Sequence, residues 1–308
     1  MKQHNFDLVA AGIDTLEIMS PTYIIGTYPF MSHDSSRRMT TDDGVTPKYK
    51  YRINPDKTLI DTSTFEGYSA AMKYVYEVSA LSNPVKTRID FRFDFYGEDY
   101  ERTSKANKLL LLLIAEKYEV KNRYQCIDML TTEQKTLCIK GKYIEVEAYN
   151  KAIQEPSGCI PCRVEFRSKA LYDDEDEDNK ELRELNKWFA RIASATTADN
   201  FNRVIEALNV HIMERYAKEK QSRSFDDMAF LYKYEDFIFT SKQMRELFAA
   251  MGYVRADKKL CQYRAKYHGV EFFSLRQIRD YTLTIRESAE RFLNCETQSQ
   301  KYPKTGMI

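Results

Sequence analysis

One segment constrains the fold of this chain more than any other. Residues 86–96 read Lys-Thr-Arg-Ile-Asp-Phe-Arg-Phe-Asp-Phe-Tyr, in which apolar and charged side chains alternate. Successive side chains of a β-strand point to opposite faces of its sheet, so the segment predicts a two-faced strand. Its apolar face would consist of Ile89, Phe91, Phe93 and Phe95. Its other face would carry paired charges, namely Arg88, Asp90, Arg92 and Asp94.

Two later segments, residues 143–151 and 162–169, have the same alternation. The first would place Glu145, Glu147 and Tyr149 on its polar face, and the second would place Arg163, Glu165, Arg167 and Lys169 there. A core-forming strand needs only its apolar side. The charged sides of three such strands therefore predict a sheet surface suited to chemistry on an anionic substrate.

The rest of the chain predicts an α+β protein with two domains. We expect a sheet backed by helices over residues 1–220, and a helical domain over residues 225–308 that resembles a helix-turn-helix or winged-helix module. Further strands are expected at residues 12–19 and 49–53, the latter in a hairpin with residues 58–65. Residues 20–47 are expected to be mostly irregular. Helices are expected over residues 66–81, 100–118, 180–195, 198–218, 257–268 and 274–294.

Composition narrows the cellular context. The 308 residues are 43% hydrophobic and 30% charged, and the longest apolar run, residues 109–115, is far short of the roughly 20 residues that span a bilayer. Together with scattered cysteines and no secretory leader, these features predict a soluble cytoplasmic protein without a membrane partner. Cys159 and Cys162 have CxxC spacing, but no second pair or histidine lies near enough to complete a zinc site.

A net charge of only +1 means that any nucleic-acid-binding surface must be local. Residues 240–281 contain nine Lys or Arg against four Asp or Glu. Two short helices around Gly252, the second of them basic, would suit duplex DNA binding. The basic side chains of that helix are Lys258, Lys259, Arg264 and Lys266. The alternative is an ordinary helical domain with solvated cations.

Three motifs in order resemble those of a known family. They are Arg-Ile-Asp-x-x-x-Asp at residues 88–94, Tyr149-x-Lys151, and the 163–169 strand followed by Tyr172. Together they resemble the rolling-circle replication initiators of filamentous phages and plasmids, and more distantly the replication-initiation factors and transposon relaxases. The resemblance covers roughly residues 13–172.

The resemblance implies an antiparallel sheet of the HUH-endonuclease kind, with the active site on its polar face. The implied activity is site-specific nicking and rejoining of single-stranded origin DNA through a 5′-phosphotyrosyl intermediate. Origin DNA in single-stranded and duplex form would be the partner, with a host helicase or polymerase acting later. Tyr172 falls where the nucleophile is expected, and Lys151, Lys169 and Arg163 match basic positions of the motifs.

Residue chemistry is compatible with this activity. Carboxylates are the oxygen ligands that Mg²⁺ or Mn²⁺ prefers, and the candidates are Asp90, Asp94, Glu145, Glu147 and Glu165. Cations stabilise the charge that develops on a phosphodiester, and Arg88, Arg92 and Arg167 are candidates for contact with DNA. A tyrosine phenol is a poor nucleophile until a cation or a base assists it.

Two features depart from the family pattern. The chain has four histidines and no His-x-His pair, so a metal would rest on carboxylates. Tyr172 is followed directly by the acidic run 173–178, which would repel a DNA backbone, so Tyr149 stays open as the nucleophile. Two non-enzymatic alternatives also stay open. One is a DNA-binding protein with the same fold and no chemistry, and the other is a structural protein whose polar face is a cross-strand ion-pair ladder.

Overall fold

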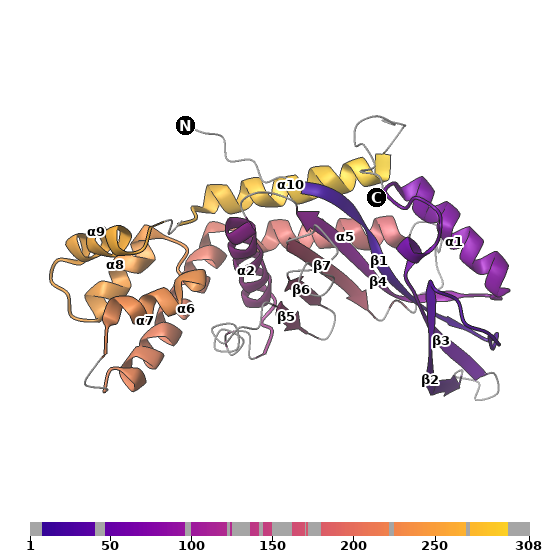
Figure 1. Ribbon diagram of the computed structural model, residues 1–308, viewed down its shortest axis with the longest axis horizontal. Helices are drawn as coiled ribbons and strands as arrows, with labels where there is room; N and C mark the ends of the chain where they lie inside the picture. The colour runs from indigo at the N-terminus through magenta and orange to yellow at the C-terminus, as the bar shows by residue number, and fades with distance from the viewer. Residues whose placement is uncertain are drawn as a thin grey trace, which may run out of the picture.

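A mixed helix and sheet architecture is seen in the computed structural model (Figure 1). It describes residues 8–40, 47–95, 100–121, 124, 136–141, 144–149, 162–169, 171, 180–221, 225–268 and 272–294. Within these ranges, seven strands form one sheet in the order β2-β3-β1-β4-β7-β6-β5, and all neighbours are antiparallel. The strands are β1 (Leu8–Ser20), β2 (Met31–Thr40), β3 (Pro47–Ile53), β4 (Val85–Phe95), β5 (Thr136–Lys140), β6 (Glu145–Tyr149) and β7 (Cys162–Lys169).

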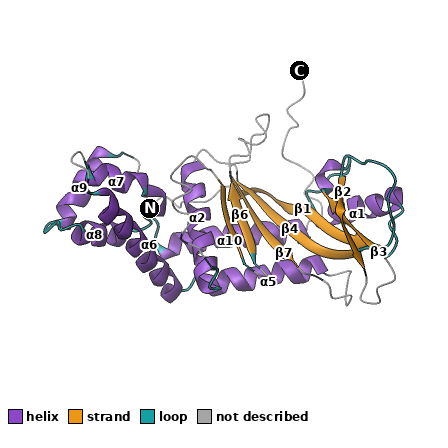
Figure 2. Ribbon diagram, turned by 90° about the horizontal axis from the view of Figure 1, so that it is seen from below, coloured by secondary structure: helices purple, strands orange, loops and turns teal. Residues whose placement is uncertain are grey.

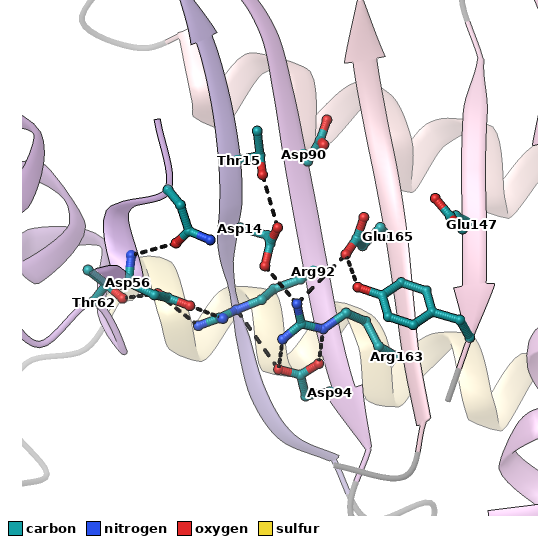
Figure 3. Close-up of polar contacts among 12 residues, drawn as sticks. Asp14, Thr15, Asp56, Thr62, Asp90, Arg92, Asp94, Glu147, Arg163 and Glu165 are labelled. Carbon is teal, nitrogen blue, oxygen red and sulfur yellow. Dashed lines mark hydrogen bonds and ion pairs between the residues drawn. The ribbon is translucent and has the colours of Figure 1, made fainter. Parts of the chain in front are cut away.

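The alternating segment at residues 86–96 is the central strand β4. It pairs with β1 on one side and with β7 on the other. Its four apolar side chains are all buried, as the alternation predicts. They lie against the helices, whereas its charged side chains lie on the opposite face (Figure 3).

Helices cover the apolar face of the sheet (Figure 2). The elements of this layer are α1 (Phe65–Ser79), α2 (Tyr100–Lys117), α5 (Lys180–Ala195) and α10 (Leu275–Asn294). Trp188 of α5 packs against Phe166 of β7 with ring centroids 5.1 Å apart, and its indole N–H donates to Ser168 Oγ at 3.0 Å. Tyr281 of α10 stacks on Phe95 of β4 at 5.1 Å. These contacts are part of the core, and they keep the apolar side of the sheet turned toward the helices and the charged side turned away.

A helical extension lies at one end of the molecule (Figure 1). It consists of α6 (Ala198–Glu219), α7 (Asp227–Lys233), the short 3₁₀ turn η3 (Glu235–Phe237), α8 (Ser241–Ala250) and α9 (Ala256–Lys266). Lys105 and Lys108 of α2 pair with Glu235 and Asp236 of η3, which joins the extension to the sheet's helical layer. The sequence division at residues 220–225 places α10 with the extension. In space α10 instead returns to the sheet and contacts β1 and α1.

Two expectations about the N-terminal part are wrong. Residues 31–40, expected to be irregular, form edge strand β2, which pairs only with β3 and so needs no alternating apolar face. Residues 58–65 do not form the second strand of a hairpin. After the 3₁₀ turn η1 (Pro55–Lys57), Thr58 Oγ1 donates to Pro55 O at 2.7 Å, and Thr64 caps α1 by accepting from Gly67 N at 3.0 Å. Local hydroxyl bonds of this kind compete with strand formation.

In the part of the chain that the structure describes, no helix has both the length and the apolar character needed to cross a bilayer.

Candidate functional site

The sheet brings together the three segments with charged faces. Strand β7 lies between β4 and β6, so their polar side chains form one continuous surface. In register, β7 residues Arg163, Glu165 and Arg167 lie opposite Asp94, Arg92 and Asp90 of β4. On the other side they lie opposite Tyr149, Glu147 and Glu145 of β6. We call this set of side chains the polar face, and it points away from α5 and α10 (Figure 3).

Arg163 connects three strands. Its guanidinium donates from Nε and Nη2 to the two carboxylate oxygens of Asp94, at 2.5 and 2.8 Å, and from Nη1 to Asp14 Oδ1 of β1 at 2.6 Å (Figure 3). The side chain is only 1% exposed. Burial acts to lower the pKa of Arg163, but the hydrogen bonds and charge of Asp94 outweigh it and raise that pKa. Arg163 is therefore a permanently charged group inside the sheet surface.

Arg167 is surrounded by carboxylates. It donates from Nη1 to Glu145 and from Nη2 to Glu165, both at 2.7 Å, and its Nη2 also pairs with Glu147. Its Nε lies 3.5 Å from Asp90. Glu147 and Glu165 are direct cross-strand neighbours, an arrangement of like charges that is destabilising on its own. Arg167 removes this repulsion by contacting both carboxylates.

Asp90 is paired with Arg88 of the same strand. The carboxylate is 0% exposed, and Arg88 donates to both of its oxygens, at 2.7 and 2.6 Å. Burial raises the pKa of Asp90, and the hydrogen bonds from Arg88 offset part of that rise.

At the end of β7, Lys169 pairs with Glu145. Burial and the nearby Arg88 charge lower the pKa of Lys169.

Tyr149 lies next to a carboxylate of β7. Its hydroxyl donates to Glu165 Oε1 at 2.6 Å, and the other oxygen of that carboxylate accepts from Arg167. Burial, followed by the negative charge of Glu165, raises the pKa of Tyr149, so the phenol stays protonated at neutral pH. A hydroxyl already bonded to a carboxylate can transfer its proton when it attacks.

Arg92 points to a partner outside the predicted set. Its guanidinium binds Asp56 of η1, with Nη2 3.1 Å from Oδ1, and Asp56 also accepts from Thr62. Gly12 of β1 leaves room for this side chain, because a Cβ there would lie 3.2 Å from Arg92 Nε. Arg92 is therefore held toward the β1 side of the polar face.

Sequence reasoning missed the roles of Asp14 and Asp56. Asp14 lies at a register shift of β1, between Ile13 and Thr15, where simple alternation no longer assigns a face. Asp56 lies in the segment expected to be a hairpin turn. No local pattern indicated the partner of either residue.

The carboxylates do not fit a bound divalent cation as they are arranged. Each of the five candidate ligands contacts an arginine or lysine. Among the residues described, no group of three or more His, Cys, Asp or Glu side chains is placed to hold a metal ion. Guanidinium groups supply the positive charge that a cation was expected to supply.

The other predicted residues fall into two sets. Tyr172, Lys151 and the acidic run 173–178 lie outside the described residues. Lys258, Lys259, Arg264 and Lys266 lie on α9, far from the polar face (Figure 1). The structure thus brings the β4, β6 and β7 residues together but does not join them to the basic helix.

Comparisons of the chain with protein-family models, with curated proteins and with solved structures found no match.

Proposed function

We propose that this protein is a DNA nicking and joining protein of the replication-initiator kind, with Tyr149 as its nucleophile. The observation that carries the proposal is the 2.6 Å hydrogen bond from Tyr149 to Glu165, set among the guanidiniums of the polar face. The order of the three sequence motifs, which resembles that of rolling-circle replication initiators, supports the same reading. Single-stranded DNA would lie across the polar face.

The proposed step is a transesterification at a phosphorus of the DNA backbone. The Tyr149 hydroxyl gives its proton to Glu165, and the phenolate oxygen attacks a backbone phosphorus. A bond forms between the tyrosine oxygen and phosphorus, and the bond to the 3′ oxygen breaks. That oxygen leaves as a 3′-hydroxyl after taking a proton, and the DNA 5′ end stays on the tyrosine. Attack by a 3′-hydroxyl on the phosphotyrosine reverses the step and rejoins the strand.

Charge on the polar face would assist this step. The phosphoryl oxygens gain negative charge during attack, and fixed cations that do not have to reorganise stabilise that charge. Arg163 lies in register with Tyr149, and Arg167 holds the carboxylate that accepts the proton. Both arginines have raised pKa values and stay charged.

A second candidate is a DNA-binding protein that performs no covalent chemistry. The specific observation in its favour is that the arginines of β4 and β7 already bind carboxylates, Arg92 through Asp56 of η1 and the others through carboxylates of the sheet. A sheet surface on which each arginine is already paired with a carboxylate can also be purely structural.

The test is formation of a covalent protein–DNA adduct. The full chain is incubated with single-stranded oligonucleotides tiling the element that carries its gene, with Mn²⁺ or with EDTA, and resolved under denaturing conditions. We expect an adduct with the wild-type protein and none with Tyr149→Phe. Glu165→Gln should slow its formation by about 10²- to 10⁴-fold, the range of general base catalysis. Tyr23→Phe, which alters an exposed tyrosine beside β2 and β3, is the matched control and should keep full activity.

The results distinguish the two candidate nucleophiles and the two candidate functions. An adduct that survives Tyr149→Phe and disappears in Tyr172→Phe would move the nucleophile to Tyr172. DNA binding without any adduct would favour the second candidate.

A further inference from the structure

We propose that one side of α9 is the surface that enters a groove of duplex DNA, an inference that rests on DNA being the ligand of the proposed function. We call this side the α9 outer face. It consists of Arg255 at the N-cap and Lys258, Cys261, Gln262 and Ala265 along the helix. This set shares only Lys258 with the four basic residues that the sequence singled out.

The two helices α8 and α9 are held in a fixed relation. Thr240 caps α8 by accepting from Gln243 N at 2.9 Å, and Gly252 ends the helix with a φ of +96°, a value that favours glycine. Tyr253 and Tyr263 then pack edge-on against Phe248 of α8. Because aromatic contacts and caps fix the turn, α9 presents a defined side outward.

The inner and outer sides of α9 differ sharply in burial. Leu260 and Tyr263 face α8 and are 3% and 0% exposed. The five residues of the α9 outer face lie three, three, one and three positions apart, as on one side of a helix, and all are exposed. Figure 1 shows α9 at the end of the molecule away from β2 and β3.

The other cations of α9 are used within the protein. Lys266 pairs with Asp226 at 2.8 Å, and Lys259 lies 4.4 Å from the ring centre of Tyr253. Arg264 donates to Ser241 Oγ at 2.8 Å and stacks over Phe272. The ion pair neutralises the charge of Lys266, and the contacts of Lys259 and Arg264 hold those two side chains against the extension.

Arg255 and Lys258 are different. Within the described part of the chain, neither makes an ion pair or a hydrogen bond through its side chain. Asp257, which lies between them in the sequence, is bound by Arg245 at 2.6 Å. The start of α9 therefore presents two unneutralised cations, which complement the charge of a phosphate backbone.

The rest of the α9 outer face suits a close approach to base edges. Cys261 and Ala265 are small and leave space on either side of Gln262. A glutamine amide can donate and accept hydrogen bonds at once, which matches the edge of adenine in the major groove. In helix-turn-helix proteins the N-terminal residues of the second helix contact base edges, and Arg255 and Lys258 hold this position on α9.

The experiment measures binding of the full chain to a random-sequence duplex oligonucleotide by fluorescence anisotropy over a series of salt concentrations. We expect the double variant Arg255→Ala with Lys258→Ala to weaken duplex binding by about tenfold or more. The slope of log affinity against log salt should fall by about 1 for each lost phosphate contact. The control, Lys73→Ala with Arg286→Ala, removes the same charge from exposed side chains of α1 and α10 and should change affinity by less than about twofold.

Three results would overturn the inference. They are no duplex binding by the wild-type protein, equal losses in the two double variants, or a larger loss in the control. The single-strand adduct assay run on the same proteins separates this inference from the proposed function. If the α9 variant loses duplex binding and neither the wild type nor a variant forms an adduct, only the nicking proposal is contradicted. If the wild type and both double variants form the adduct and duplex binding is unchanged, only the role of α9 is contradicted.

Discussion

At the scale of single residues, the polar face consists of charges that depend on one another. Arg163 is almost fully buried, and it satisfies Asp94 with two hydrogen bonds and Asp14 with a third. A buried ion pair of this kind adds little net stability compared with apolar side chains. Removing one partner, however, leaves an uncompensated charge in the sheet. The arginines of this surface are therefore structural requirements whether or not they also assist chemistry.

Replacement of Arg163 tests this dependence. We expect Arg163→Met to lower the free energy of unfolding by about 3–5 kcal/mol, because Asp94 would stay buried without its two hydrogen bonds from Arg163 and would keep only the 3.9 Å contact with Arg92. Urea denaturation followed by the fluorescence of Trp188, the single tryptophan, measures the change. Arg52→Met is the matched control, because Arg52 is exposed on β3, and this change should alter stability by less than about 0.5 kcal/mol. A similar loss of stability in both variants would show that Asp94 does not depend on Arg163.

At the scale of elements, side-chain caps mark where helices α6, α7 and α8 of the extension begin. Asp226 accepts hydrogen bonds from the backbone N–H groups of Met228 and Ala229, at 2.8 and 3.3 Å, and so starts α7. The same carboxylate pairs with Lys266 of α9. The hydrogen bond from Lys266, followed by that from Ala229 N, lowers the pKa of Asp226. One side chain thus joins the start of α7 to the end of α9.

The cap predicts a stability effect with a defined pH dependence. Asp226→Ala should lower the free energy of unfolding by about 1 kcal/mol, the usual value of a lost N-cap, and Asp226→Asn should cost less because an amide oxygen still caps the helix. Since folding lowers the pKa of Asp226, its ionised form adds stability above its unfolded value of 3.8. That contribution disappears as the pH falls through the folded value. Thermal melts at neutral and acidic pH should show the gap between wild type and Asp226→Asn closing in acid.

At the scale of the whole molecule, the chain crosses between its two parts more than once. Helix α2 holds η3 through Lys105 and Lys108, and α10 returns from the extension to cover β1 and stack on Phe95. Tyr281 of α10 also donates to Asn107 of α2 in the core. A cut at residue 225 would remove α10 and expose the apolar side of the sheet. The extension is therefore coupled to the sheet.

This coupling predicts a single unfolding transition. Trp188 reports on the sheet, whereas far-UV circular dichroism is dominated by helices of both parts. The two signals should give the same urea midpoint, and Tyr281→Ala should shift both by the same amount. Two separate midpoints in the wild-type protein would show that the extension unfolds on its own.

Much of the fold could be predicted because its signals are local. Residues 86–96, 143–151 and 162–169 alternate regularly, and all three contain sheet strands with the expected faces. The helix expected over residues 100–118 is α2, with its run of leucines in the core. Strand β2 was missed because an edge strand without a clear apolar face has no period to detect. The roles of Tyr149, Tyr172 and a metal ion stay predictions.

The sequence alone determined which faces of β4, β6 and β7 are charged, because side-chain alternation follows from the geometry of a single strand. Which charged side chains contact one another depends on the tertiary structure. Arg163 and Asp14 are 149 residues apart, and Arg92 reaches Asp56 in a segment that was expected only to turn a hairpin. Such pairs depend on the order and register of strands, and on a register shift in β1 that changes where one carboxylate points. Register is set by packing across the whole sheet, so it is not encoded in any short stretch of chain.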